Sequence, residues 1–236
     1  MKIEAKLLKD FVVKATADCT INELVIRTVP EGIKSMMRTP DNTTAIMARL
    51  TKNRINTFNP EFGVIAINNT TMFKNILGTF NGIISLDKQE NVLRINGEGK
   101  YADVLLADES FIDVELKKEL TNITFDNNFK LPAKIFNNAV TNSTLLKTEK
   151  ITLEVKDKKF SIMSGEKNSN RITEEENVDF PNTKTVLSAV TFPVFRLLEG
   201  EVEVFMKDEN YALQLINKTE DLTVKTIIAP IQEDEE

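Results

Sequence analysis

The sequence contains no histidine, no tryptophan, one cysteine and only eight glycines among its 236 residues. Without histidine, the chain cannot build a Ser-His-Asp or Cys-His nucleophile system or a histidine-ligated zinc site. The single cysteine, Cys19, excludes a disulfide within the chain and fits a reducing compartment. No phosphate-binding loop of the Walker A or G-x-G-x-x-G type is present. We therefore expect neither an enzyme nor a bound metal or cofactor.

Long apolar runs are also lacking. No stretch approaches the roughly 20 residues that a membrane span needs, and Met1-Lys2-Ile3-Glu4 shows no apolar segment typical of a secretory signal. Hydrophobic residues make up 41% of the chain and charged residues 28%, which is typical of a soluble globular protein. Because the net charge is −6, contact with nucleic acid would require one locally basic face.

The order of predicted elements repeats at about half the chain length. Residues 88–91 separate two strand-like runs, and residues 207–210 do the same at an offset of 207 − 88 = 119 positions. Earlier in each half, residues 23–37 and 150–164 form matching strand–turn–strand patterns. Such internal repetition predicts a duplicated domain, with two similar halves side by side and a ring as one arrangement of them.

Each half combines strands with two helices, which indicates an α+β fold with antiparallel sheets. Helices are predicted over residues 5–17, 70–80, 131–146 and 192–199 from apolar side chains at helical spacing. Strands are predicted over residues 23–29, 33–38, 44–51, 63–68, 101–107, 150–155, 159–164, 185–189 and 222–228. The acidic stretch 171–178 fits either a strand or a mobile loop.

Residues 108–122 interrupt this pattern, because acidic and apolar side chains alternate there. One interpretation is an extended linker that points its apolar side chains outward; an ordinary amphipathic helix or strand fits the periodicity equally well. Taking the linker interpretation, we divide the chain into an N-terminal domain (1–110), a connecting loop (111–122) and a C-terminal domain with an acidic tail (123–236).

The four predicted helical stretches are more basic than the rest of the chain. Together with Lys147, which directly follows the third stretch, they hold seven cations against the two acids Asp10 and Glu199, a balance of 7 − 2 = +5 in a chain of net charge −6. If the helices share one face, that face suits the phosphates of nucleic acid without reading sequence. Lysines also favour exposed helix positions for reasons unrelated to function. The cations are Lys6, Lys9, Lys14, Lys74, Lys134, Lys147 and Arg196.

Three segments resemble proliferating cell nuclear antigen (PCNA), the sliding-clamp family of archaea, eukaryotes and some of their viruses. Residues 222–236 are similar to the family's closing strand, Ala-Pro dipeptide and acidic tail. Residues 23–50 resemble its first sheet, and residues 112–115 the start of its interdomain connecting loop. The resemblance covers essentially the whole chain in the order of elements.

The resemblance implies a DNA polymerase processivity factor without enzymatic activity. Three such chains would close a homotrimeric ring around double-stranded DNA, with helices lining the inner face and antiparallel sheets outside. The seven helix cations would face the duplex, independently of its sequence. Expected partners are a DNA polymerase, a clamp loader and other replication or repair proteins with PCNA-interacting peptides, but no membrane. The expected location is the cytoplasm of an archaeon or of a virus-infected cell, or the nucleus of a eukaryotic host.

The resemblance also implies a partner-peptide pocket and a subunit interface. The matching pocket positions are Arg38, Leu116, Leu120, Tyr211, Ala229, Pro230 and Ile231. Arg38 departs from the family, which usually has Met-Asp before Pro or Ser in this turn, so partner choice should differ. Edge strands near residues 101–107 and 171–178 are the expected head-to-tail contacts between subunits. Two alternatives stay open: a checkpoint-type or heterotrimer clamp subunit that does not close a ring alone, and a monomeric β-rich interaction protein.

Overall fold

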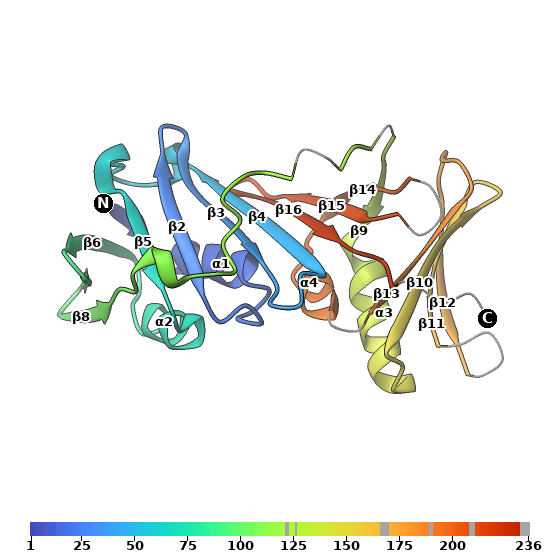
Figure 1. Ribbon diagram of the computed structural model, residues 1–236, viewed down its shortest axis with the longest axis horizontal. Coiled ribbons are helices and arrows are strands. Elements are labelled where there is room, and N and C mark those ends of the chain that lie inside the picture. The colour runs from blue at the N-terminus through green and yellow to red at the C-terminus, as the bar shows by residue number, and fades with distance from the viewer. Residues whose placement is uncertain (121–122, 126, 166–169, 189–190, 208–210, 232–236) are drawn as a thin grey trace. The chain divides into compact units, whose positions relative to one another are not determined.

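The chain forms two compact units that repeat one order of elements (Figure 1). The computed structural model describes residues 1–120, 123–125, 127–165, 170–188, 191–207 and 211–231. One unit comprises Met1–Glu119 with Glu220–Val224, and the other comprises Leu120–Thr219 with the described residues from Lys225 onward. In the described chain, no helix is long and apolar enough to cross a membrane.

The first unit begins with a strand and a helix, continues through four strands, and ends with a second helix and three strands. Its elements are β1 (Lys2–Glu4), α1 (Ala5–Ala15), β2 (Leu24–Val29), β3 (Gly32–Arg38), β4 (Thr44–Thr51), β5 (Val64–Ile67), α2 (Thr70–Leu77), β6 (Ile83–Gln89), β7 (Val92–Gly97) and β8 (Lys100–Leu105). Short 3-10 turns lie at Lys52–Arg54, Pro60–Phe62 and Glu109–Phe111.

The second unit repeats this order element by element. Its elements are β9 (Phe129–Pro132), α3 (Ala133–Leu146), β10 (Lys150–Lys156), β11 (Lys159–Ser164), β12 (Ile172–Asn177), β13 (Thr183–Ser188), α4 (Phe192–Arg196), β14 (Glu201–Phe205), β15 (Leu213–Lys218) and β16 (Leu222–Ile228). Strand neighbours repeat as well: β1-β6-β7-β8 matches β9-β14-β15-β16, and β5-β2-β3-β4 matches β13-β10-β11-β12. The predicted α+β fold and its duplication are therefore confirmed.

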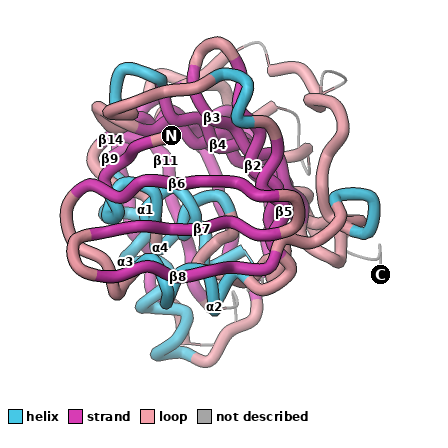
Figure 2. Tube along the Cα trace, turned by 90° about the vertical axis from the view of Figure 1, so that its left-hand side faces the viewer, coloured by secondary structure: helices cyan, strands magenta, loops and turns pink. Residues whose placement is uncertain are grey.

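In each unit, the apolar side of the longer helix packs on the sheet that follows it. Leu8, Phe11 and Val12 of α1 are completely buried, and α1 contacts β3, β4 and α2. In the second unit, α3 packs on β10, β11, β12 and α4. Figure 2 looks onto β6, β7 and β8, which lie side by side as antiparallel neighbours. Period-two burial along β3 shows that one face of this strand meets α1 while the other points away.

Two turns show why these segments fold locally. In the β10–β11 turn, Asp157 and Lys158 have φ angles of 51° and 63°, the left-handed pair that suits the twist of a tight hairpin. At the start of β3, a Cβ on Gly32 would lie 2.0 Å from the Leu50 carbonyl oxygen. Only glycine fits this close approach between β3 and β4.

Two predictions need correction, and one open alternative is decided. The helix predicted over 131–146 begins at Ala133, because Pro132 ends β9 and occupies the position before the first helical turn. Of the two alternatives for residues 171–178, the strand is confirmed, because β12 covers Ile172–Asn177 at the edge of its sheet. The apolar side chains of the linker do not all point outward: Phe111 is 79% exposed, whereas Ile112 is 3% exposed. The predicted turn at 207–210 lies mostly outside the described residues, and so does the acidic tail from residue 232.

We expect the aromatic cluster of the second unit to dominate its stability. Phe136 is fully buried, with its ring centroid 5.2 Å from that of Phe195 and 6.4 Å from that of Phe160. Replacing Phe136 by alanine should lower the free energy of unfolding by about 3–5 kcal/mol, because apolar burial is removed and a cavity remains. Urea denaturation measures this decrease. Leu145→Ala on the same helix, where the side chain is 72% exposed, should change stability little.

Candidate functional site

The helix cations of the first unit differ in how they are engaged. Lys6 is exposed, Lys9 is half-exposed, and neither forms an ion pair with a described residue. Lys74 on α2 donates a hydrogen bond to the Asp18 carboxylate, with an Nζ–Oδ1 distance of 2.9 Å. This contact raises the pKa of Lys74 and neutralises its charge locally. Lys14 lies in the last turn of α1 and is also engaged by a neighbour.

Asp18 reaches Lys74 because of an unusual turn after α1. Ala17, Asp18 and Cys19 have consecutive φ angles of 47°, 54° and 65°, a left-handed conformation that is costly for residues other than glycine. The Thr16 hydroxyl stabilises the turn by donating to the Val12 carbonyl and accepting from the Cys19 N–H. Counting charges along the predicted helices missed this carboxylate, since Asp18 lies beyond the helix end.

The cations of the second unit are spread over α3 and α4. Lys134 is exposed near the start of α3, and Arg196 is exposed in the last residue of α4. Lys147 caps the end of α3 in a left-handed conformation with φ of 53°. None of the three forms an ion pair with a described residue. Among the described residues, no cluster of carboxylate or thiol ligands could hold a metal ion.

The predicted peptide-pocket residues fall into two groups. Arg38 and Leu116 belong to the first unit, whereas Leu120, Tyr211 and the stretch 229–231 belong to the second. Within the second unit, β13 ties part of its group together: the Tyr211 carbonyl accepts from the Thr185 hydroxyl, and the Ile231 N–H donates to the Val186 carbonyl. Ala229 is exposed, and Pro230 and Leu120 are half-exposed.

Sequence reasoning missed the neighbours of Tyr211. Its ring packs edge-on against Phe125 with centroids 5.6 Å apart, and the Lys207 ammonium lies over it at 5.5 Å. Phe125 also contacts Phe205 at 5.9 Å. An aromatic residue shortly after the linker was the available signal for this cluster.

In the first unit, residues 112–119 form a connecting segment that contacts β3 through two backbone hydrogen bonds and one β-bridge. The Arg38 N–H donates to the Val114 carbonyl at 2.8 Å, and the Leu116 N–H donates to the Met36 carbonyl at 2.9 Å. Between these two bonds, Met37 and Glu115 pair as an antiparallel bridge. The half-exposed Leu116 thus lies beside the end of β3 that extends beyond its pairing with β2. The predicted pocket residues Arg38 and Leu116 are therefore brought close together.

An ion pair with a buried carboxylate holds this connecting segment against the first unit. The Glu115 side chain is 3% exposed and accepts two hydrogen bonds from the Arg27 guanidinium, at 2.7 and 3.0 Å. Lys117 also contacts Glu115, and Arg27 reaches Glu109 at 3.0 Å. Burial alone would raise the pKa of Glu115, but the hydrogen bonds from Arg27 and Lys117 outweigh it and lower that pKa. The sequence analysis placed Glu115 in the linker without naming a partner for it, so its buried ion pair with Arg27 is a finding of the structure.

We expect this ion pair to make the first unit sensitive to acid. Because the folded-state pKa of Glu115 is lowered, its contribution is present above the ordinary carboxyl value of 4.5 and is lost as the pH falls through the lower folded value. The urea midpoint of the wild-type chain should therefore fall more steeply on acidification than that of Glu115→Gln. The control Glu119→Gln, whose side chain is 46% exposed, should keep the wild-type slope. Identical slopes for wild-type and Glu115→Gln would contradict the assignment.

Comparison with solved structures identifies the architecture. No protein-family model matches the chain, and no curated protein matches it in sequence. Among solved structures, A. fulgidus PCNA bound to the C-terminal region of FEN-1 matches with a TM-score of 0.84 at 16% identity, over 99% of this chain and 98% of that one. The PCNA of Entamoeba histolytica matches with a TM-score of 0.78 at 17% identity, over 98% of both chains. A chain of the PCNA2–PCNA3 complex of Sulfolobus tokodaii gives 0.75 at 16%, over 98% of this chain and 99% of that one. The chain therefore has the fold of the PCNA sliding clamps along essentially its whole length.

Proposed function

We propose that the chain is a processivity factor for a DNA polymerase, acting as a sliding clamp that encircles duplex DNA. The observation that carries the proposal is the duplication itself, which places a terminal strand at a sheet edge in each unit, β8 in the first and β12 in the second. β8 ends the order β1-β6-β7-β8, and β12 ends the order β12-β11-β10-β13. Unlike edges on one chain permit head-to-tail contacts that close a ring. The shared fold of PCNA proteins supports this proposal.

The side chains of β8 and β12 favour pairing between these two unlike edges over pairing between two copies of the same edge. β12 carries Glu174, Glu175 and Glu176; Glu175 pairs with Lys159, and the other two acids would repel their counterparts if two copies of β12 came together. β8 exposes Tyr101 and Leu105, which are 66% and 70% exposed, while its Asp103 is neutralised by a bidentate bond from Arg94. Pairing β8 of one chain with β12 of the next would cover these apolar side chains without opposing like charges.

In such a ring, the helix cations would contact the duplex through its phosphates. The contacts would be few and weak, which permits sliding, while the closed ring keeps the chain on DNA. A polymerase tethered to the ring through a short peptide would gain effective concentration at the primer end. The A. fulgidus protein, with the C-terminal region of FEN-1 bound, gives a precedent for such peptide binding.

The ring predicts a mass of three times 26.7 kDa in solution. Leu105→Lys should weaken each interface by at least tenfold, because a Leu side chain contributes about 1.5–3 kcal/mol when fully buried. Light scattering over a range of concentrations measures the shift toward monomer. Leu145→Lys changes a leucine of similar exposure on α3 and should leave the trimer intact. A wild-type chain that stays monomeric at all concentrations would contradict a homomeric ring.

The basic helices predict a salt-dependent affinity for duplex DNA. Reversing Lys6, Lys9 and Lys134 to glutamate should weaken binding about tenfold or more. The plot of log affinity against log salt concentration should also become less steep, by about 0.9 for each phosphate that the variant no longer neutralises. Fluorescence anisotropy with a labelled duplex measures both quantities.

A matched control reverses Lys118, Lys156 and Lys184, which lie outside the helices and form no ion pair with a described residue. This variant has the same net charge as the helix variant, so a general effect of charge would weaken DNA binding equally in both. Equal decreases in affinity for the two triple variants would reject the helix assignment.

A further inference from the structure

The outward face of β3 and β4 carries a strip with an apolar centre and cations at both ends. On β3, Lys34, Met36 and Arg38 alternate with buried residues and are half-exposed. Their direct partners on β4 are the exposed Arg49 and the buried Met47 and Ala45, which are 5% and 7% exposed. Directly opposite residues of an antiparallel pair share one face of the sheet. The resulting rows are Lys34 with Arg49, Met36 with Met47, and Arg38 with Ala45.

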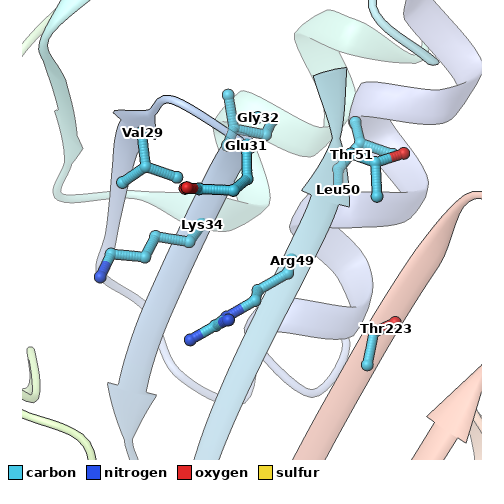
Figure 3. A pocket seen from close by; sticks show the side chains of 9 residues that line it. Val29, Glu31, Gly32, Lys34, Arg49, Leu50, Thr51 and Thr223 are labelled. Atoms are coloured by element: carbon cyan, nitrogen blue, oxygen red, sulfur yellow. The ribbon is translucent and has the colours of Figure 1, made fainter. Parts of the chain in front are cut away.

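At the end of the strip formed by Lys34 and Arg49, the neighbouring acidic side chains do not neutralise both positive charges. Lys34 and Arg49 face each other across the two strands, an arrangement of like charges that costs free energy. Arg49 pairs with Glu119 of the connecting segment, whereas Lys34 forms no ion pair with any residue that the structure describes. Both side chains line a hollow of about 360 Å³. Figure 3 shows them reaching the same side of the strands, with Glu31 nearer the β2–β3 turn.

Arg38 occupies the other end with neutral partners alone. Its guanidinium donates to the Asn42 side-chain oxygen and to the Asp113 carbonyl at 3.0 Å. Neither partner is charged, and a guanidinium has five N–H donors in all. Arg38 is therefore held in place with donors left over for a carboxylate. Arg38 lies four positions after Lys34, a distance of about 13 Å along an extended strand.

The second unit provides an internal comparison. By element order, β11 and β12 correspond to β3 and β4. There the outward cation Lys159 pairs with Glu175 of the neighbouring strand at 2.6 Å. On this surface of the second unit, the cation is thus paired with an acid of the neighbouring strand. On the corresponding surface of the first unit, Lys34 and Arg38 have no such acidic partner among the described residues.

We propose that the strip formed by Lys34, Met36, Arg38 and Arg49 binds a partner peptide that has acidic residues on both sides of an apolar centre. The apolar side chains of the peptide lie on the half-exposed Met36 and beside the half-exposed Leu116. One carboxylate meets Lys34, and a second, about four positions away in an extended peptide, meets Arg38. The inference rests on the proposed function, because peptide tethering supplies the partner.

The test uses three labelled twelve-residue peptides that differ at two positions only. Each has a central Leu-Phe pair, and the two flanking positions, four residues apart, carry glutamate, glutamine or lysine. Fluorescence anisotropy with the full chain should show the glutamate peptide binding about tenfold more tightly than the lysine peptide, with the glutamine peptide between them. The preference should shrink as salt concentration rises, because exposed charge pairs are screened.

Matched variants locate the preference. Lys34→Gln combined with Arg38→Gln should bind all three peptides alike, with an unchanged urea midpoint as evidence of folding. Lys156→Gln combined with Lys184→Gln removes the same charge elsewhere and should keep the preference. Equal binding of the three peptides by the wild-type chain, or a preference that survives in the first double variant, would overturn the proposal. A chain that forms a trimer and binds DNA but does not discriminate the peptides overturns this inference alone; a monomer that prefers the glutamate peptide overturns only the ring.

Discussion

The buried carboxylate of Glu115 is the constraint on which the outward surface of the first unit depends. A carboxylate that is 3% exposed must be paired, because an unpaired buried charge costs several kcal/mol. Arg27 supplies the pair from β2, 88 residues earlier in the chain. This contact brings residues 114–116 against β3, where two backbone hydrogen bonds and one β-bridge also hold them. In this position the segment presents the Asp113 carbonyl to Arg38 and the Glu119 carboxylate to Arg49. The position of the segment therefore decides which cations of the strip are neutralised.

The duplication preserves the interior and lets the surface diverge. Both units bury the apolar side of their first helix on the sheet that follows, with Phe11 in one unit and Phe136 in the other fully buried. Outward side chains are free of this packing constraint, so their charges can differ between copies. Lys159 pairs with Glu175 on one sheet, whereas Lys34 faces Arg49 on the other. A single duplicated fold can therefore present two chemically different surfaces.

Much of the fold could be predicted because its signals are local. The helical spacing of Leu8, Phe11 and Val12, and the alternation along β3, each depend on a few neighbouring residues. The site could be predicted less well, because its decisive contacts join distant residues. The alternation of acidic and apolar residues after position 108 does not reveal that Glu115 turns inward, since its partner Arg27 lies on another strand. The Asp18–Lys74 contact depends on a left-handed turn that no local pattern indicated.

The period of two along β3 also separates the two proposed duties of the first unit. Ile33, Ser35 and Met37 are buried on the face that α1 covers, whereas Lys34, Met36 and Arg38 point to the opposite face. The helix lysines and the peptide strip therefore lie on opposite sides of one sheet. Between exposed charges, screening over about 10 Å in ordinary salt weakens any interaction across this layer. Under the two proposals, a change of charge on the strip would alter the choice of partner peptide with little effect on contact with DNA, because the two sets of side chains lie on opposite faces and each is screened by the surrounding solvent.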